Sequence, residues 1–90
     1  MTAVLIAYDL SKPGQKYEAL HEKIKAYGIW SHSLESTWIV SKKGITAQSV
    51  YDDLKNELDS NDRIFCVEID GKPRTGWLRK ATWAWIKAHV

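Results

Sequence analysis

The sequence predicts an α+β fold in which a four-stranded antiparallel sheet carries two helices on one face and a third helix follows at the C-terminus. Three observations lead to this prediction: one long apolar run, two segments with apolar residues at helical spacing, and two short strand-like segments joined by a tight turn. The 90 residues are 44% hydrophobic and 27% charged, which is the balance of one small globular domain.

A buried strand and an amphipathic helix are predicted for the first third of the chain. Residues 3–8 form a continuous apolar run, which favours a strand over residues 2–9 that is buried on both faces. The turn signals Ser11, Pro13 and Gly14 follow. Apolar side chains then recur at helical spacing, at Tyr17, Leu20, Ile24 and Tyr27. Because Gly28 suits a left-handed C-cap, this spacing predicts a helix over residues 14–27.

A hairpin, a second helix and a last strand are predicted next. Residues 29–41 favour two short strands joined by a turn near residues 34–36. Thr46 can cap a helix whose inner positions lie four apart, at Val50, Leu54 and Leu58. Residues 64–69 form another apolar strand. The order strand, helix, strand, strand, helix, strand is the split βαβ arrangement of ferredoxin-like folds, with both helices on one face of the sheet.

A helical extension over residues 71–90 is predicted to follow a core of residues 1–70. The segment from Asp70 to Pro73 breaks the chain, and residues 77–89 predict the third helix. One side of this helix gathers residues suited to packing, namely Trp77, Leu78, Ala81, Ala84, Trp85 and Ala88. Trp83 is expected to point elsewhere, near cationic side chains.

The second face of the predicted sheet needs a cover. The first strand does not alternate between apolar and polar residues, as a strand with one face in water would. Further apolar side chains follow in other strands, at Ile39, Phe65, Val67 and Ile69. We therefore expect the third helix, or the same face of a second subunit in a symmetric homodimer, to cover this face. Three rings are expected to find partners outside the chain: Trp30, Trp38 and Trp83.

Composition excludes several classes of protein. The sequence contains no run of 18 or more apolar residues, so we expect no membrane span, and its N-terminus lacks the pattern of a secretory signal. The single cysteine, Cys66, excludes an internal disulfide framework and a cysteine-rich zinc module. One cysteine fits a reducing compartment, so we expect a cytoplasmic protein.

Positive charge is concentrated near the C-terminus. The first 62 residues carry seven lysines and nine acidic residues, a net charge of −2, whereas residues 63–90 have a net charge of +4. Rings interleaved with cations suit single-stranded nucleic acid, because bases stack on rings and phosphates pair with cations. The candidate residues are Arg74, Arg79, Lys80 and Trp83. The alternative, an ordinary solvated face, is favoured by an overall net charge of only +2.

Two residues could carry chemistry. Asp9 ends the first strand, where its carboxylate could hold Mg²⁺ or Mn²⁺ together with Asp9 of a second subunit; capping of the following loop is the favoured alternative. His32 lies among hydroxyls and close in sequence to Glu35, a set that could perform acid–base work on a phosphodiester. A regular pleat, however, places Trp30, His32 and Leu34 on one face and Glu35 on the other. A partly buried, hydrogen-bonded histidine is the favoured interpretation.

Short motifs along nearly the whole chain resemble the second core CRISPR-associated (Cas) protein family, and within it a compact SinR-like branch. They are Tyr8-Asp9-Leu10, Tyr27-Gly28, Ser33-Leu34-Glu35-Ser36-Thr37-Trp38, and Gly76-Trp77-Leu78 with Trp83-Ala84-Trp85. The resemblance implies a ferredoxin-like homodimer of stacked sheets, a shared metal position at Asp9, and metal-dependent cleavage of RNA or DNA in antiviral defence.

The chain also departs from this family. The basic residues usual after the strand-end aspartate are reduced to Lys12 and Lys16, which we take as candidate nucleic-acid contacts. The predicted third helix replaces a strand that often swaps between subunits, so partnership with the integrase is not expected.

Two functions from different classes follow. The first is a small dimeric nucleic-acid-binding protein that acts as a magnesium- or manganese-dependent endonuclease or endoribonuclease. The second is a non-catalytic dimeric adaptor or regulator in a defence, toxin–antitoxin or phage context. The sequence leaves open whether the protein is an enzyme.

Overall fold

The computed structural model describes residues 1–12 and 17–90. Its elements, in chain order, are β1 (Thr2–Asp9), α1 (Glu18–Lys25), β2 (Trp30–Leu34), β3 (Thr37–Lys42), α2 (Ala47–Leu54), a 3₁₀ turn η1 (Lys55–Glu57), β4 (Arg63–Glu68) and α3 (Lys80–His89). Each predicted strand and helix therefore exists, with bounds shifted by a few residues. The start of the helix predicted over residues 14–27, and the candidate contact Lys16, lie outside the described residues.

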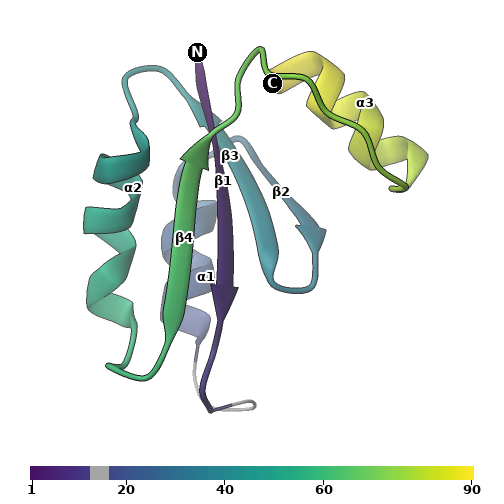
Figure 1. Cartoon of the computed structure of the whole chain (residues 1–90). Coiled ribbons are helices and arrows are strands. Elements are labelled where there is room, and N and C mark those ends of the chain that lie inside the picture. Colours follow the sequence, from purple (N-terminus) through teal and green to yellow (C-terminus); the bar gives the residue numbers. More distant parts are fainter. Residues whose placement is uncertain (13–16) are drawn as a thin grey trace.

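The four strands form one antiparallel sheet in the order β2-β3-β1-β4 (Figure 1). β1 lies between β3 and β4, so Val4 faces Val40 on one side and Glu68 on the other. This central place explains why the first strand is apolar without alternation, since both of its faces are covered along most of its length. The prediction of an α+β protein with a four-stranded antiparallel sheet is confirmed.

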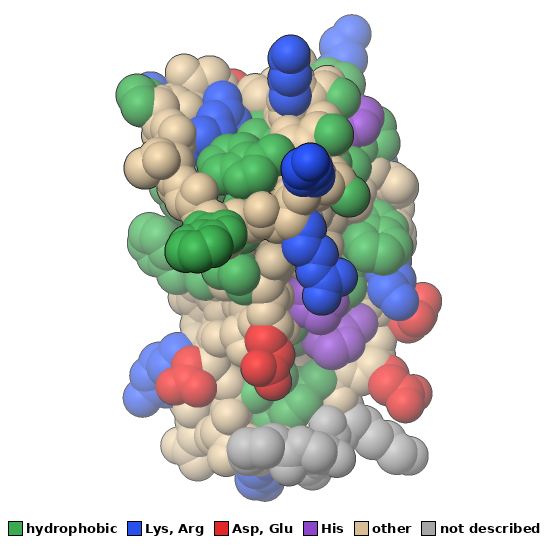
Figure 2. All heavy atoms as spheres, turned by 90° about the vertical axis from the view of Figure 1, so that its right-hand side faces the viewer, with side chains coloured by type: hydrophobic (Ala, Val, Ile, Leu, Met, Phe, Trp, Pro, Cys, Tyr) green, Lys and Arg blue, Asp and Glu red, His purple; other side chains and the backbone are tan. Residues whose placement is uncertain are grey.

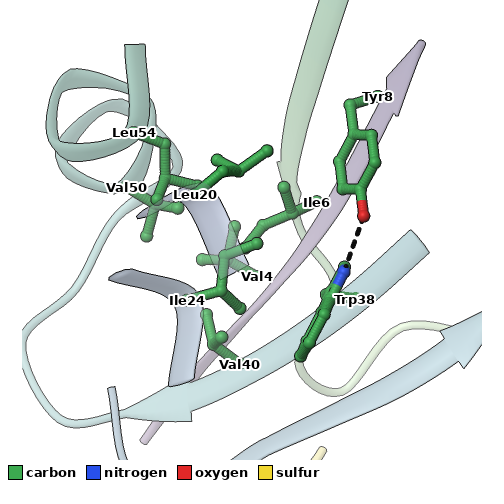
Figure 3. Packing of buried hydrophobic residues seen from close by; sticks show 9 residues of the cluster. All are labelled: Val4, Ile6, Tyr8, Leu20, Ile24, Trp38, Val40, Val50 and Leu54. Carbon is green, nitrogen blue, oxygen red and sulfur yellow. Dashed lines mark hydrogen bonds between the residues drawn. The ribbon is translucent and has the colours of Figure 1, made fainter. Parts of the chain in front are cut away.

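Both α1 and α2 pack on one face of the sheet, as predicted. The core there is built from alternate residues of β1 and β3 together with the inner positions of the two helices (Figure 3). Its buried members are Val4, Ile6, Tyr8, Leu20, Ile24, Trp38, Val40, Val50 and Leu54. Trp38 is only 1% exposed, so the expectation that its ring needs a partner outside the chain is wrong.

α2 begins as the sequence predicts. The hydroxyl of Thr46 accepts a hydrogen bond from the backbone N–H of Ser49, and the Ser49 hydroxyl accepts one from the backbone N–H of Thr46. This reciprocal cap satisfies two amide groups that the first helical turn leaves without a partner. The helix is thereby held with Val50 and Leu54 towards the sheet.

α3 covers part of the second face of the sheet. Ile86 of α3 is buried against Ala3 of β1 and Ile39 of β3, which form a second, smaller core. The expected cover is therefore supplied in part by the chain itself. Other side chains on the second face are not covered: Phe65 is 64% exposed and Leu34 is 56% exposed.

The side of α3 that packs differs from the prediction. α3 begins at Lys80, and Arg79 before it has an extended backbone with φ −63° and ψ 149°. Trp77 therefore lies ahead of the helix and is 99% exposed. Trp83 instead packs at the second core with Ile86, three residues further along α3. The expected packing face is correct for Leu78 and Trp85, which are partly buried against the second core, but wrong for Trp77, because the prediction assumed a helix that starts at residue 77.

A bulge in β2 changes the faces of the hairpin. Ser31 of β2 pairs with Ile39 of β3, and the next pair is Leu34 with Thr37, so β2 holds one extra residue. Leu34 consequently shares the second face with Thr37 and Ile39, rather than the face of Trp30 and His32 as a regular pleat predicted.

Among the helices of residues 1–12 and 17–90, none has the length and apolarity of a membrane span.

Candidate functional site

A cavity of about 580 Å³ lies between the tip of the β2–β3 hairpin and the start of α3. His32 and Glu35 line it from the hairpin, and Trp77, Arg79 and Thr82 line it from the C-terminal segment. Two predicted site residues from distant parts of the sequence, His32 and Arg79, are thus brought to one place. In the space-filling view of this side, lysine and arginine side chains lie mostly in the upper half, and histidine side chains lie near the centre and at the upper right (Figure 2).

His32 is held in a defined orientation. Its ring stacks on Trp38 with centroids 3.9 Å apart and planes inclined by 11°. Its Nε2 lies 2.9 Å from the backbone carbonyl oxygen of Glu35, which can only accept, so Nε2 carries the hydrogen of the neutral ring. Nδ1 is then the nitrogen that can accept a hydrogen bond from a ligand. The expected hydrogen bond is confirmed, but the residue is exposed, so the expected partial burial is wrong.

Behind His32 lies a chain of hydrogen bonds that the sequence did not predict. The indole N–H of Trp38 donates to the Tyr8 hydroxyl at 2.9 Å, and this hydroxyl lies 3.1 Å from Nε2 of His21. Because Tyr8 receives the indole hydrogen, its own O–H is free to donate to His21, which must then be unprotonated at Nε2. The helical spacing of Tyr17, His21 and Ile24 was a signal that His21 faces inward.

Burial and nearby charges shift the pKa values of His21 and Tyr8, two members of this hydrogen-bonded chain. Burial lowers the pKa of His21, and the neighbouring His32, whose ring centroid is 6.1 Å away, lowers it further. Burial raises the pKa of Tyr8; the hydrogen bond from Trp38 lowers it, while the charge of Glu35 raises it. His21 and Tyr8 are therefore both favoured in their neutral forms, behind a ring that faces solvent.

The cationic residues near this cavity are exposed. Arg74, Arg79 and Lys80 all lie in the segment before α3 or at its first turn, and each is exposed to solvent. Trp77 beside them is 99% exposed, whereas Trp83 is half-buried. The fully free ring of the C-terminal segment is therefore Trp77, which the sequence placed in the packing face.

Asp9 is exposed at the end of β1, opposite Arg63 of β4. In residues 1–12 and 17–90, no group of three or more histidine, cysteine, aspartate or glutamate side chains could hold a metal ion. Lys12, also near this end of the sheet, forms an exposed ion pair with Asp59 at 3.9 Å. A cage for Mg²⁺ or Mn²⁺ needs several oxygen ligands, so the residues described in one chain do not fit either metal.

The nearby buried carboxylate, Asp62, is already fully engaged. Its Oδ1 accepts from the backbone N–H of Ser11 at 2.8 Å, from the Ser11 hydroxyl at 3.0 Å and from the Tyr17 hydroxyl at 3.2 Å, and its Oδ2 accepts from the backbone N–H of Asp59 at 2.8 Å. The N–H of Ser11 is the main cause of the lowered pKa of Asp62. Asp62 thus ties the loop after β1 to the turn before β4, a role that the sequence did not reveal.

The chain was compared with models of known protein families, with curated proteins and with solved structures, and none of them matches it. The resemblance to the CRISPR-associated family therefore stays a prediction. The arguments for function rest on the side chains that the fold brings together.

Proposed function

We propose that the protein binds single-stranded nucleic acid at the cavity between the β2–β3 hairpin and the start of α3. The observation that carries this proposal is Trp77, which is 99% exposed and lines the same cavity as Arg79 and His32. A base stacked on this exposed ring would gain about 1–3 kcal/mol.

Each neighbouring group has a part in such a complex. The guanidinium of Arg79, which lines the cavity, can pair with a phosphate. Arg74 and Lys80 do not line it, but they are exposed close to Arg79 in the chain and can pair with phosphates further along the nucleic acid. Nδ1 of His32 can accept a hydrogen bond from a base or from a ribose hydroxyl. The glutamate at position 35 also lines the cavity and disfavours a phosphate close to itself.

Fluorescence anisotropy with a labelled single-stranded oligonucleotide tests the proposal. Trp77→Ala should weaken binding about tenfold through lost stacking. Arg79→Ala should also make the plot of log association constant against log salt concentration less steep by about 0.7, the value for one phosphate contact on a single strand. Tyr51→Ala and Lys55→Ala are matched controls, because both residues are exposed and belong to α2 and η1 on the opposite side of the sheet. Equal loss in these controls would contradict the proposed site.

We further propose that the fold is ferredoxin-like and that the protein forms a homodimer. The order of elements and the central place of β1 between β3 and β4 support the fold assignment. The dimer is supported by the second face of the sheet, where Phe65 is 64% exposed and Leu34 is 56% exposed. A mass determination in solution checks it, and a monomer at micromolar concentration would contradict it.

Metal-dependent cleavage remains a prediction attached to this dimer. It requires Asp9 of two subunits to face one another, since residues 1–12 and 17–90 of one chain hold no group of three or more side chains that could bind a metal. A nuclease assay titrated with Mg²⁺ or Mn²⁺ should then show cleavage by the wild type and none by Asp9→Asn. The second candidate function, a non-catalytic adaptor or regulator, is favoured by the exposed apolar face and predicts binding without any cleavage.

A further inference from the structure

A second cavity, of about 210 Å³, lies between the second face of the sheet and the C-terminal segment. The residues that line it belong to the sheet strands, to the segment that follows β4 and to α3. Figure 1 shows how these three parts are arranged. The principal apolar residues lining it are Leu5, Ile39, Ile69, Leu78, Trp83 and Ile86. It is separate from the proposed nucleic-acid site in character, because its lining is dominated by apolar side chains.

Two cations stand at this apolar cavity. Lys72 and Arg74 line it and are also exposed to solvent, so they lie at its mouth. Among the described residues that line it, none is acidic, and the remaining polar side chains are hydroxyls such as Thr75. A ligand with an apolar part and a single negative charge at one end matches this arrangement. Its apolar part would displace water from the cavity walls, and its charge would pair with the two cations at the mouth.

We propose that this cavity binds a small hydrophobic monoanion, of the class of the aromatic carboxylates. The volume supports a small ligand, because pockets for drug-sized molecules run from about 300 to 1,000 Å³. A nucleobase fits less well: its ring nitrogens and carbonyl groups would be buried among Leu5, Ile39 and Ile86 with few hydrogen-bond partners.

A second copy of the chain also fits this cavity less well. The cavity is walled within one chain by Trp83 and Leu78 on one side and by the sheet on the other, whereas Phe65, which is exposed on the same face, does not line it. Leu34, the other exposed apolar residue of this face, does line the cavity, so a dimer through Leu34 would compete with the ligand, whereas a dimer through Phe65 alone would leave the cavity available. The cavity shares Ser33, Leu34 and Leu78 with the proposed nucleic-acid cavity, but Trp77 and Arg79 line only the latter, so variants at those two residues separate the two proposals.

Calorimetric titration with 2-naphthoate, and with the uncharged 2-naphthalenemethanol as its matched analogue, tests the proposal. Naphthoate should bind with a dissociation constant on the order of 0.1 mM, and the alcohol about tenfold more weakly. The double variant Lys72→Ala/Arg74→Ala should lower the affinity for naphthoate to that for the alcohol and leave the alcohol unchanged. Lys42→Ala/Lys43→Ala removes two exposed lysines that do not line the cavity, and should change neither affinity.

A variant that fills the cavity provides the second arm. Thr75 is exposed and lines the cavity, so Thr75→Trp should block both probes without disturbing the core. Trp77→Ala, which tests the nucleic-acid site, should leave naphthoate binding unchanged. The proposal is overturned if no saturable binding occurs, if the two probes bind equally, or if naphthoate binding falls as protein concentration rises, because the last result would mean that a second copy covers the cavity.

Discussion

The indole N–H of Trp38 donates a hydrogen bond of 2.9 Å to the hydroxyl of Tyr8 inside the main core (Figure 3). The bond joins β3 to β1, and Trp38 is only 1% exposed. A large side chain with a polar atom can be buried here because that atom has a partner within the core. On its other side the same hydroxyl reaches His21 of α1, so one group links two strands and a helix.

Tyr8→Phe should lower the free energy of unfolding by about 1–3 kcal/mol, because it leaves the buried indole N–H of Trp38 without an acceptor. Urea unfolding followed by circular dichroism measures this change. Tyr51→Phe is the matched control, since the Tyr51 side chain is 40% exposed and its hydroxyl makes no hydrogen bond within the described part of the chain. A loss of similar size in the control would contradict the role given to the Tyr8 hydroxyl.

The stability of the protein should depend on pH through His21. The folded-state pKa of His21 lies below the ordinary value of 6.5, so the unfolded chain binds the proton more tightly than the folded one. The contribution of neutral His21 to the free energy of unfolding is therefore fully present above about pH 6.5 and is lost as the pH falls through the lower folded-state pKa. His21→Gln should reduce the difference between urea midpoints measured at about pH 8 and about pH 5. His89→Gln removes an imidazole beside Trp85, away from this chain of hydrogen bonds, and should keep the wild-type difference.

Asp62 should make stability depend on pH in the same direction as His21, but in a more acidic range. Its pKa is lowered below the ordinary 3.8 by the N–H of Ser11, so its contribution is present above that value and is lost as the pH falls through the lower folded-state pKa. Asp62→Asn should lower the urea midpoint at neutral pH, and the difference from the wild type should shrink in strong acid. Asp52→Asn, at an exposed position of α2, should show no such pH-dependent difference.

The packing of α3 can be tested at Ile86. This side chain is 6% exposed and contacts the second core, so Ile86→Ala should cost about 2–4 kcal/mol of unfolding free energy. Lys87→Ala, one residue further along α3 and exposed, should change stability by less than about 0.5 kcal/mol. Little effect from Ile86→Ala would mean that α3 does not rest on the sheet of its own chain in solution.

The thiol of Cys66 should react slowly in the folded protein. Burial raises its pKa to about 11, from an ordinary 9.0, so the thiolate fraction near neutral pH falls about a hundredfold. Reaction with a chromogenic disulfide reagent should be at least that much slower in buffer than in concentrated guanidinium chloride. Equal rates in the two solvents would mean that β4 opens readily.

Much of the fold was accessible from local patterns. The apolar run of β1 indicated a strand buried on both faces, and the spacing of Val50 and Leu54 indicated the inner face of α2. Thr46 marked the start of that helix, and its cap is present. These features depend on residues close together in the chain, so they can be predicted from the sequence alone.

The sequence identified some residues of the candidate site but not how they come together. His32 and Arg79 were singled out separately, but their meeting at one cavity depends on where the segment after β4 returns to the hairpin. Trp77 was assigned to the packing face because the helix was expected to start at residue 77, whereas α3 begins at Lys80 and leaves Trp77 exposed ahead of it. His21 was passed over because its partner, Tyr8, lies 13 residues away on another element.

The sequence by itself determined the strands, the helices and which side of most of them is apolar, because hydrophobic periodicity and caps act between neighbours in the chain. Only the tertiary structure decided which side chains meet. The bulge that turns Leu34 to the second face, the start of α3 and the pairing of Trp38 with Tyr8 all depend on contacts between distant segments. A shift of one residue reverses the face of a strand and turns the face of a helix by about 100°, and local sequence patterns do not specify position that finely.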